Sequence, residues 1–141
     1  MYRCNGDLYL CHEAADAFWG LAQQLDNESI DIVSDGRIYA LVVNTAFACE
    51  LFLKTLSIKL TPDNSFLKTH KLGDLVLDLD QVVQDQIRNE YNKQPHKNSL
   101  DGMLNEFNEA FIDWRYSMEK GVGGTITDLL SFARVLSSLC K

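Results

Sequence analysis

One stretch of the chain constrains its fold more than any other, the segment from about Asp35 to Leu60. Apolar residues occupy almost every direction around a helix built on this segment, and a helix that is apolar nearly all round is a buried one. These residues are Leu41, Val42, Val43, Ala46, Phe47, Ala48, Cys49, Leu51, Phe52, Leu53 and Leu56. The run is interrupted by Asn44, Glu50, Lys54 and Lys59. We therefore expect the central helix of a core rather than a membrane span, which needs roughly 20 mostly apolar residues.

Further helices are predicted on both sides of this one, because apolar residues recur there at three- and four-residue spacings. We expect them at about 10–26, 70–79, 80–91, 100–120 and from about 125 to the end. Thr69 and Ser99 are the expected N-cap residues of two of these helices. Gly121 is the expected stop of the long helix that begins at 100, and Asp128 is the capping-box partner of Thr125 in the last one.

The scarcity of turn residues supports the same fold class. Only two prolines and eight glycines punctuate the 141 residues, which leaves too few turns for an all-β fold. A chain of this length corresponds to one domain. The sequence therefore predicts an all-α, antiparallel bundle of four to six helices, a single domain over residues 1–141 with its core at about 10–140.

The charge balance limits the partners of such a bundle. Twenty acidic and thirteen basic residues give a net charge of −7, and a field of that sign repels bulk DNA. A locally basic pocket for one nucleotide or one RNA loop remains compatible with this charge. The N-terminus shows no secretory signal, so we expect a cytoplasmic protein with no membrane association.

Metal binding is not expected, and neither is a cofactor. The four cysteines form no Cys-x-x-Cys pair, and the spacing of Cys4, Cys11 and His12 matches no zinc pattern. The glycine-rich motifs that bind nucleotide phosphates are also absent from the sequence.

Glu50 and Lys54 are the first candidate site residues. They lie one turn apart on the central helix and share their direction with apolar residues. A buried carboxylate in such surroundings needs a partner, since an uncompensated buried charge costs several kcal/mol. The alternative is an ordinary ion pair on a half-exposed face, worth about 0.3–0.5 kcal/mol.

Arg115 is the second candidate, on the long helix predicted after Ser99. It borders the stripe formed by Leu104 and Phe111, and Glu119 lies one turn further along the same edge. The planar guanidinium is suited to a carboxylate or a phosphate in a groove between helices. The alternative is a structural clamp to Glu50 or Glu119.

His70 is the third candidate, at or just after the expected N-cap Thr69. The positive end of a helix favours an anion nearby and keeps a histidine neutral, which suits an acid–base group. The alternative is a packing residue.

Three short motifs in this order resemble the HEPN superfamily, and in particular its small bacterial helical members. They are Glu50-Leu51-Phe52-Leu53-Lys54, His70-Lys71-Leu72 and Trp114-Arg115-Tyr116, within a resemblance that spans roughly residues 10–140. The resemblance implies a bundle of four to five helices, homodimers, and an association with nucleotides or RNA. Some members of the superfamily are metal-independent ribonuclease toxins paired with nucleotidyltransferase-like antitoxins.

The catalytic signature of that superfamily is an Arg, often followed by Asn, with a His after four to six further residues. The nearest string here runs from Arg88 and Asn89 to His96, with seven intervening residues and a proline. In RNA cleavage of this kind the His assists an oxygen of the ribose or the leaving group, and the Arg stabilises the phosphate. The alternative is that both are exposed loop residues.

Three functions follow as hypotheses. The first is a HEPN-like module of a toxin–antitoxin or defence system that binds a nucleotide or RNA segment in an interhelical groove. Its expected edge consists of Glu50, Lys54, His70, Arg115, Tyr116 and Glu119. The second is a metal-independent ribonuclease toxin that uses Arg88 with His96, or Arg115 with His70. The third is a non-catalytic interaction dimer in which the charged residues only fix the register of the helices.

Overall fold

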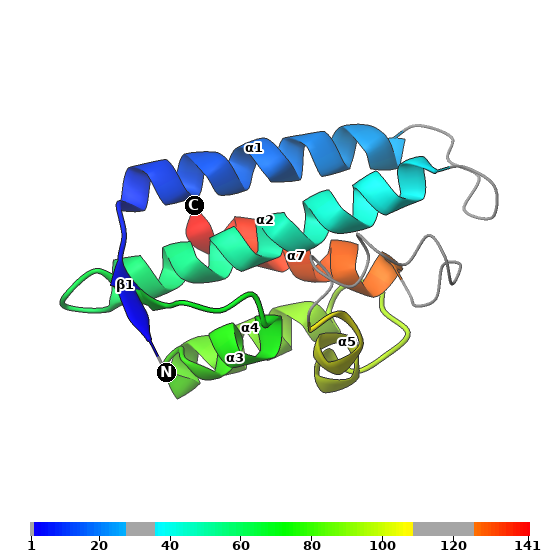
Figure 1. The fold of residues 1–141 in the computed structure, drawn as a ribbon. Coiled ribbons are helices and arrows are strands. Elements are labelled where there is room, and N and C mark those ends of the chain that lie inside the picture. Colours follow the sequence, from blue (N-terminus) through cyan, green and yellow to red (C-terminus); the bar gives the residue numbers. More distant parts are fainter. Residues whose placement is uncertain (1, 28–35, 109–125) are drawn as a thin grey trace.

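The computed structural model describes residues 2–27, 36–108 and 126–141, and these form six helices and one two-stranded ribbon (Figure 1). The helices are α1 (Leu8–Asn27), α2 (Arg37–Leu60), α3 (Leu72–Leu77), α4 (Gln81–Asn92), α5 (Leu100–Phe107) and α7 (Ile126–Cys140). The strands are β1 (Arg3–Asn5) and β2 (Ser65–Leu67). The prediction of a mainly helical chain is confirmed, and the assignment to a HEPN-like bundle stays a prediction.

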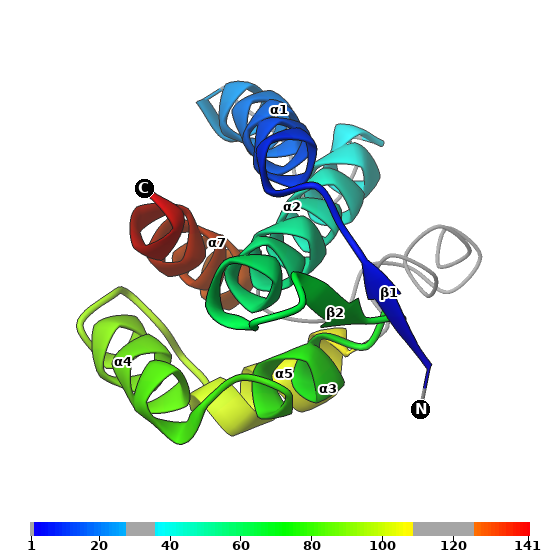
Figure 2. The same ribbon diagram turned by 90° about the vertical axis from the view of Figure 1, so that its left-hand side faces the viewer.

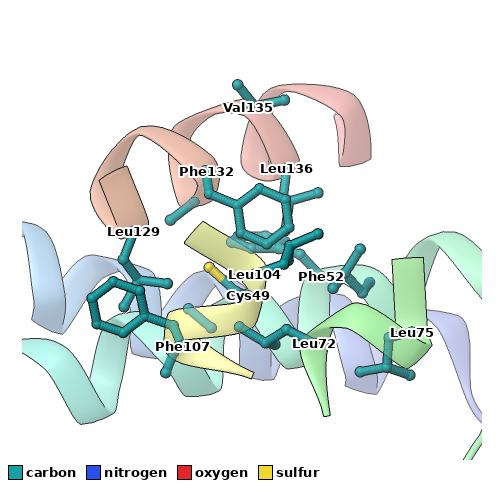
Figure 3. Close-up of a cluster of buried hydrophobic side chains, with 14 of the residues drawn as sticks. Cys49, Phe52, Leu72, Leu75, Leu104, Phe107, Leu129, Phe132, Val135 and Leu136 are labelled. Carbon is teal, nitrogen blue, oxygen red and sulfur yellow. The ribbon is translucent and has the colours of Figure 1, made fainter. Parts of the chain in front are cut away.

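The centre of the fold is α2, as its apolar pattern predicts. It packs against α1 on one side, against α7 on another, and against α3 and β2 near its C-terminal half (Figures 1 and 2). Cys49 and Phe52 of α2 lie fully buried in the main core. Figure 3 shows side chains of α3, α5 and α7 converging on them, among them Leu72, Phe107 and Phe132.

By length and composition alone, α2 is long and apolar enough to span a membrane. The expectation that its polar residues make it too polar for a membrane span is therefore wrong. Its most apolar window is 72% buried inside the protein. Burial of that kind is typical of the core helix of a folded domain, so burial rather than composition explains the apolar pattern.

The first departure from the all-α prediction is the ribbon. β1 pairs with β2 in antiparallel register, with Cys4 opposite Phe66. The Arg3 side chain reinforces the pairing, because its Nε donates to Ser65 Oγ at 3.0 Å and its terminal nitrogen donates to Asp78 at 2.6 Å. The ribbon ties the segment before α1 to the chain that follows α2.

A predicted helix boundary also differs from the structure: α3 begins at Leu72 rather than at His70. The backbone N–H of Leu72 donates to the Asn108 carbonyl at 3.0 Å, and the N–H of Gly73 donates to Asn108 Oδ1 at 2.8 Å. Asn108 therefore caps α3 from a distant part of the chain. Thr69 is not the N-cap, although its hydroxyl accepts the N–H of Lys71 at 3.1 Å in a local turn.

Ser99 is confirmed as an N-cap, since its Oγ accepts the backbone N–H of Gly102 at 3.1 Å. The helix that it starts, α5, ends at Phe107. Positions 109–120 of the predicted helix and its expected stop at Gly121 lie outside the described residues.

Asp128 has a different role from the expected capping box. Its buried carboxylate accepts the backbone N–H groups of Lys97 at 2.7 Å and Asn98 at 3.1 Å. Its expected partner, Thr125, lies outside the described residues. Ser131 donates to the Pro95 carbonyl nearby, so the start of α7 holds the loop between α4 and α5.

Candidate functional site

Three polar side chains from two segments meet on the surface of α2. Lys54 Nζ donates to Glu50 Oε2 at 2.9 Å, one helical turn away. His70, in the connection between β2 and α3, places its Nδ1 2.9 Å from Glu50 Oε1. We call Glu50, Lys54 and His70 the Glu50 cluster.

Burial distinguishes this cluster from an ordinary surface ion pair. The side chain of Glu50 is 3% exposed and that of Lys54 is 11% exposed, whereas that of His70 is 52% exposed. The alternative of a half-exposed pair is therefore wrong for Glu50 and Lys54. Both carboxylate oxygens have a partner, as a buried carboxylate requires.

Strand β2 supplies part of the cover over the cluster. Lys54 Nζ lies 5.3 Å from the centroid of the Phe66 ring, which is a cation–π arrangement. The buried ammonium group therefore interacts with a carboxylate and with an aromatic face.

The contact with Glu50 fixes the chemistry of the His70 ring. An ionised carboxylate can only accept, so Nδ1 carries the hydrogen of this bond and Nε2 is the acceptor in the neutral imidazole. A carboxylate that orients a histidine in this way is a common support for acid–base chemistry. The N-cap of α3 is Lys71, so His70 lies one residue outside the helix. The interaction that orients its ring is therefore the contact with Glu50, and not the N-terminal end of that six-residue helix.

The structure does not bring Arg88 and His96 together. Arg88 on α4 pairs with Asp101 of α5 at 3.0 Å. His96 packs against the Tyr91 ring, with centroids 5.1 Å apart, and its Nδ1 lies 2.7 Å from the Gln94 carbonyl. Within the described residues no contact joins the two, and both remain candidates from the sequence alone.

Tyr91 is held by the loop between α4 and α5, which also carries His96. Its hydroxyl donates to the Asn98 carbonyl at 2.9 Å. Burial, followed by the charges of Asp128 and Glu106, raises the pKa of Tyr91 to about 12. The ring is therefore a neutral support for the loop that carries His96.

Arg88 also lines a groove of about 240 Å³ that sequence reasoning missed. Val76, Leu77 and Leu104 form its apolar wall, and Gln84 and Arg88 lie on its polar side. These residues come from three separate helices, and no single stretch of sequence marks them as neighbours. Neither this groove nor two further ones that involve α4 and α7 include a member of the Glu50 cluster.

The other candidate ligand-binding residues, Arg115, Tyr116 and Glu119, lie outside the described residues. In the described part of the chain, no three His, Cys, Asp or Glu side chains lie close enough together to hold a metal ion. Cys11 contacts the Thr55 hydroxyl at 3.3 Å, and burial raises the pKa of its thiol. It is therefore a protonated packing group and a poor metal ligand.

Comparisons of the chain with protein-family models, with curated proteins and with solved structures gave no match.

Proposed function

We propose that this protein is a helical module that binds a nucleotide or a short RNA segment at the Glu50 cluster. One observation carries the proposal: a buried carboxylate on the mostly apolar helix α2 holds a buried cation and a half-exposed histidine. The proposal includes the further edge of Arg115, Tyr116 and Glu119, and a homodimer within a toxin–antitoxin or defence system with a nucleotidyltransferase-like antitoxin. The resemblance to HEPN proteins supports these additions.

The physical argument for a binding role is that burying the charges of Glu50 and Lys54 costs desolvation free energy. Replacing a buried ion pair with apolar residues of similar volume is often neutral or stabilising, so packing alone does not call for these residues. The Lys54 ammonium is a cationic donor of the kind that suits a phosphate. The net charge of −7 favours one nucleotide or a short strand over a long duplex.

Binding is tested with a fluorescent single-stranded RNA and a panel of nucleoside mono- and triphosphates. We expect His70→Ala to weaken the best ligand at least tenfold, about 1.4 kcal/mol. His96→Ala is the matched control, because His96 is also exposed but lies on Tyr91 and not on Glu50. No binding by any probe, or equal binding by parent and His70→Ala, contradicts the proposal.

A metal-independent ribonuclease is the second candidate, and the orientation of His70 by Glu50 favours it. RNA cleavage is measured in the presence of EDTA, with parent, His70→Ala and the double variant Arg88→Ala/His96→Ala. Loss of cleavage only in His70→Ala identifies the Glu50 cluster as the catalytic site. Loss only in the double variant identifies the Arg88–His96 pair. A parent protein that leaves RNA intact excludes the enzyme and leaves a binding module or the non-catalytic interaction dimer.

A further inference from the structure

A groove on a different face of the molecule runs between α4 and the C-terminal ends of α2 and α7. Figure 2 looks along α7 and shows α4 below it, beside the end of α2. The groove has two lobes that share Gln86 of α4 and Leu139 of α7. We call it the α4–α7 groove.

One lobe, of about 130 Å³, is apolar. Four aliphatic side chains line it, together with Gln86 and the long side chain of Lys59. These four are Leu56, Leu60, Val83 and Leu139. Leu60 is 47% exposed, so part of this apolar surface lies in contact with water.

The other lobe, of about 180 Å³, is polar and contains Arg134. The guanidinium of Arg134 makes one long hydrogen bond, to Ser131 Oγ at 3.4 Å, and has no carboxylate partner among the described residues. Glu90 lines the same lobe, but it pairs with Lys93 at 3.0 Å. An unpaired guanidinium is a strong donor to an anion because it offers two parallel N–H groups.

The two lobes lie end to end. Val83 in the apolar lobe and Glu90 in the polar lobe are seven residues apart on α4, which corresponds to about 10 Å along the helix axis. Their combined volume reaches the lower end of the range for small-molecule sites, about 300 Å³. Lys59, whose long side chain lines the apolar lobe, has no ion-pair partner in the described part of the chain.

We propose that the α4–α7 groove binds an aliphatic carboxylate, with its chain in the lobe lined by Leu56 and Leu139 and its carboxylate on Arg134. The proposal is independent of the Glu50 cluster. An apolar channel that ends at an unpaired cation is complementary to a ligand that is apolar along its length and anionic at one end.

Isothermal titration calorimetry with decanoate, below its micelle-forming concentration, tests the proposal. We expect one molecule to bind per chain and Arg134→Gln to weaken binding at least tenfold. Arg88→Gln is the matched control, because Arg88 is an exposed arginine outside the groove. Acetate tests the head group without the chain, and decylammonium tests the chain with the opposite charge; neither is expected to bind.

Three results overturn the proposal: no heat of binding with decanoate, equal affinity of the parent and Arg134→Gln, or binding of decylammonium as tight as that of decanoate. The last result would show adsorption of any amphiphile to exposed apolar surface. Circular dichroism of Arg134→Gln confirms that the variant is folded, which is expected because Arg134 is exposed. His70→Ala should bind decanoate as the parent does, so this test and the nucleotide test fail separately.

Discussion

Two lysines of this chain pair with a glutamate one turn away, in opposite environments. Lys54 and its partner Glu50 are buried, whereas Lys93 and Glu90 lie at the surface. The difference matters because removal of one partner from a buried pair leaves a charge in a medium that solvates it poorly. At the surface, water replaces the lost partner at little cost.

Lys54→Ala is therefore expected to lower the free energy of unfolding by about 3–5 kcal/mol. The matched change Lys93→Ala is expected to lower it by less than about 1 kcal/mol. Urea denaturation of the two variants beside the parent measures both effects. Equal and small effects would mean that Glu50 and Lys54 are solvated in solution.

Tyr91 gives a prediction about pH. Its folded-state pKa of about 12 lies above the ordinary tyrosine pKa of about 10, so its contribution is complete below pH 10 and is lost as the pH rises toward 12. Tyr91→Phe removes the hydrogen bond to Asn98 and should cost about 1 kcal/mol at pH 7. The stability difference between parent and variant should shrink above pH 10, as measured by urea denaturation at pH 7, 9 and 10.5. A difference that does not change with pH would mean that Tyr91 ionises equally in both states.

At the scale of the elements, two glycines next to or within α1 differ in the space around them. A Cβ atom at Gly6, between β1 and α1, would lie 2.5 Å from Ile58 Cδ1 and 3.0 Å from the Phe66 ring. At Gly20, in the middle of α1, it would meet nothing within 4 Å. The first glycine permits the close approach of the ribbon to α2, and the second has no such role.

Gly6→Ala is expected to destabilise the protein by about 1–3 kcal/mol, because Ile58 is buried and must move into a packed core. Gly20→Ala is expected to stabilise it by about 0.5–1 kcal/mol through helix propensity. Thermal unfolding measures both changes: the melting temperature should fall for Gly6→Ala and rise for Gly20→Ala. A neutral or stabilising Gly6→Ala would mean that the ribbon is not seated on α2 in solution.

Periodicity predicted where most helices lie, because each buries a regular apolar stripe; α1 and α4 begin and end within two residues of expectation. The ribbon escaped prediction because three-residue strands are too short to show an alternating pattern. The start of α3 was misplaced because Asn108, which caps it, lies more than thirty residues away in sequence. Caps made by distant residues leave no local signal.

The candidate site was predictable only in part. The pattern of α2 identified Glu50 and Lys54 as polar residues at apolar positions, and their burial follows from the same pattern. The contact of His70 with Glu50 depends on how the chain turns after β2, which spacing does not determine. The α4–α7 groove was missed because its lining comes from three helices, each contributing polar residues that look ordinary alone.

At the scale of the whole molecule, the four cysteine thiols differ in burial, so their reactivity measures how well the packed helices exclude solvent. Cys49 and Cys140 are buried; burial raises the pKa of Cys140 to about 12 and holds that of Cys49 well above its usual range. Cys4 and Cys11 are partly exposed. The thiolate is the reactive form, so accessibility and pKa act together.

We expect iodoacetamide to alkylate Cys4 first in the folded protein, and Cys49 and Cys140 only as fast as the whole domain unfolds. Peptide mass spectrometry over a time course measures each rate, with the urea-unfolded protein as the reference for full reactivity. Rapid alkylation of Cys49 in the folded state would contradict the packing of α2 against α7.

The ribbon has a consequence for the time course of access to the Glu50 cluster. It joins residues 62 positions apart, and it consists of only three residues on each side. Because few hydrogen bonds hold so short a ribbon, we expect it to open before the helices separate. Since Phe66 lies over Lys54, each such opening is expected to uncover the buried ammonium group, and the rate of backbone hydrogen exchange in β2 reports how often the ribbon opens.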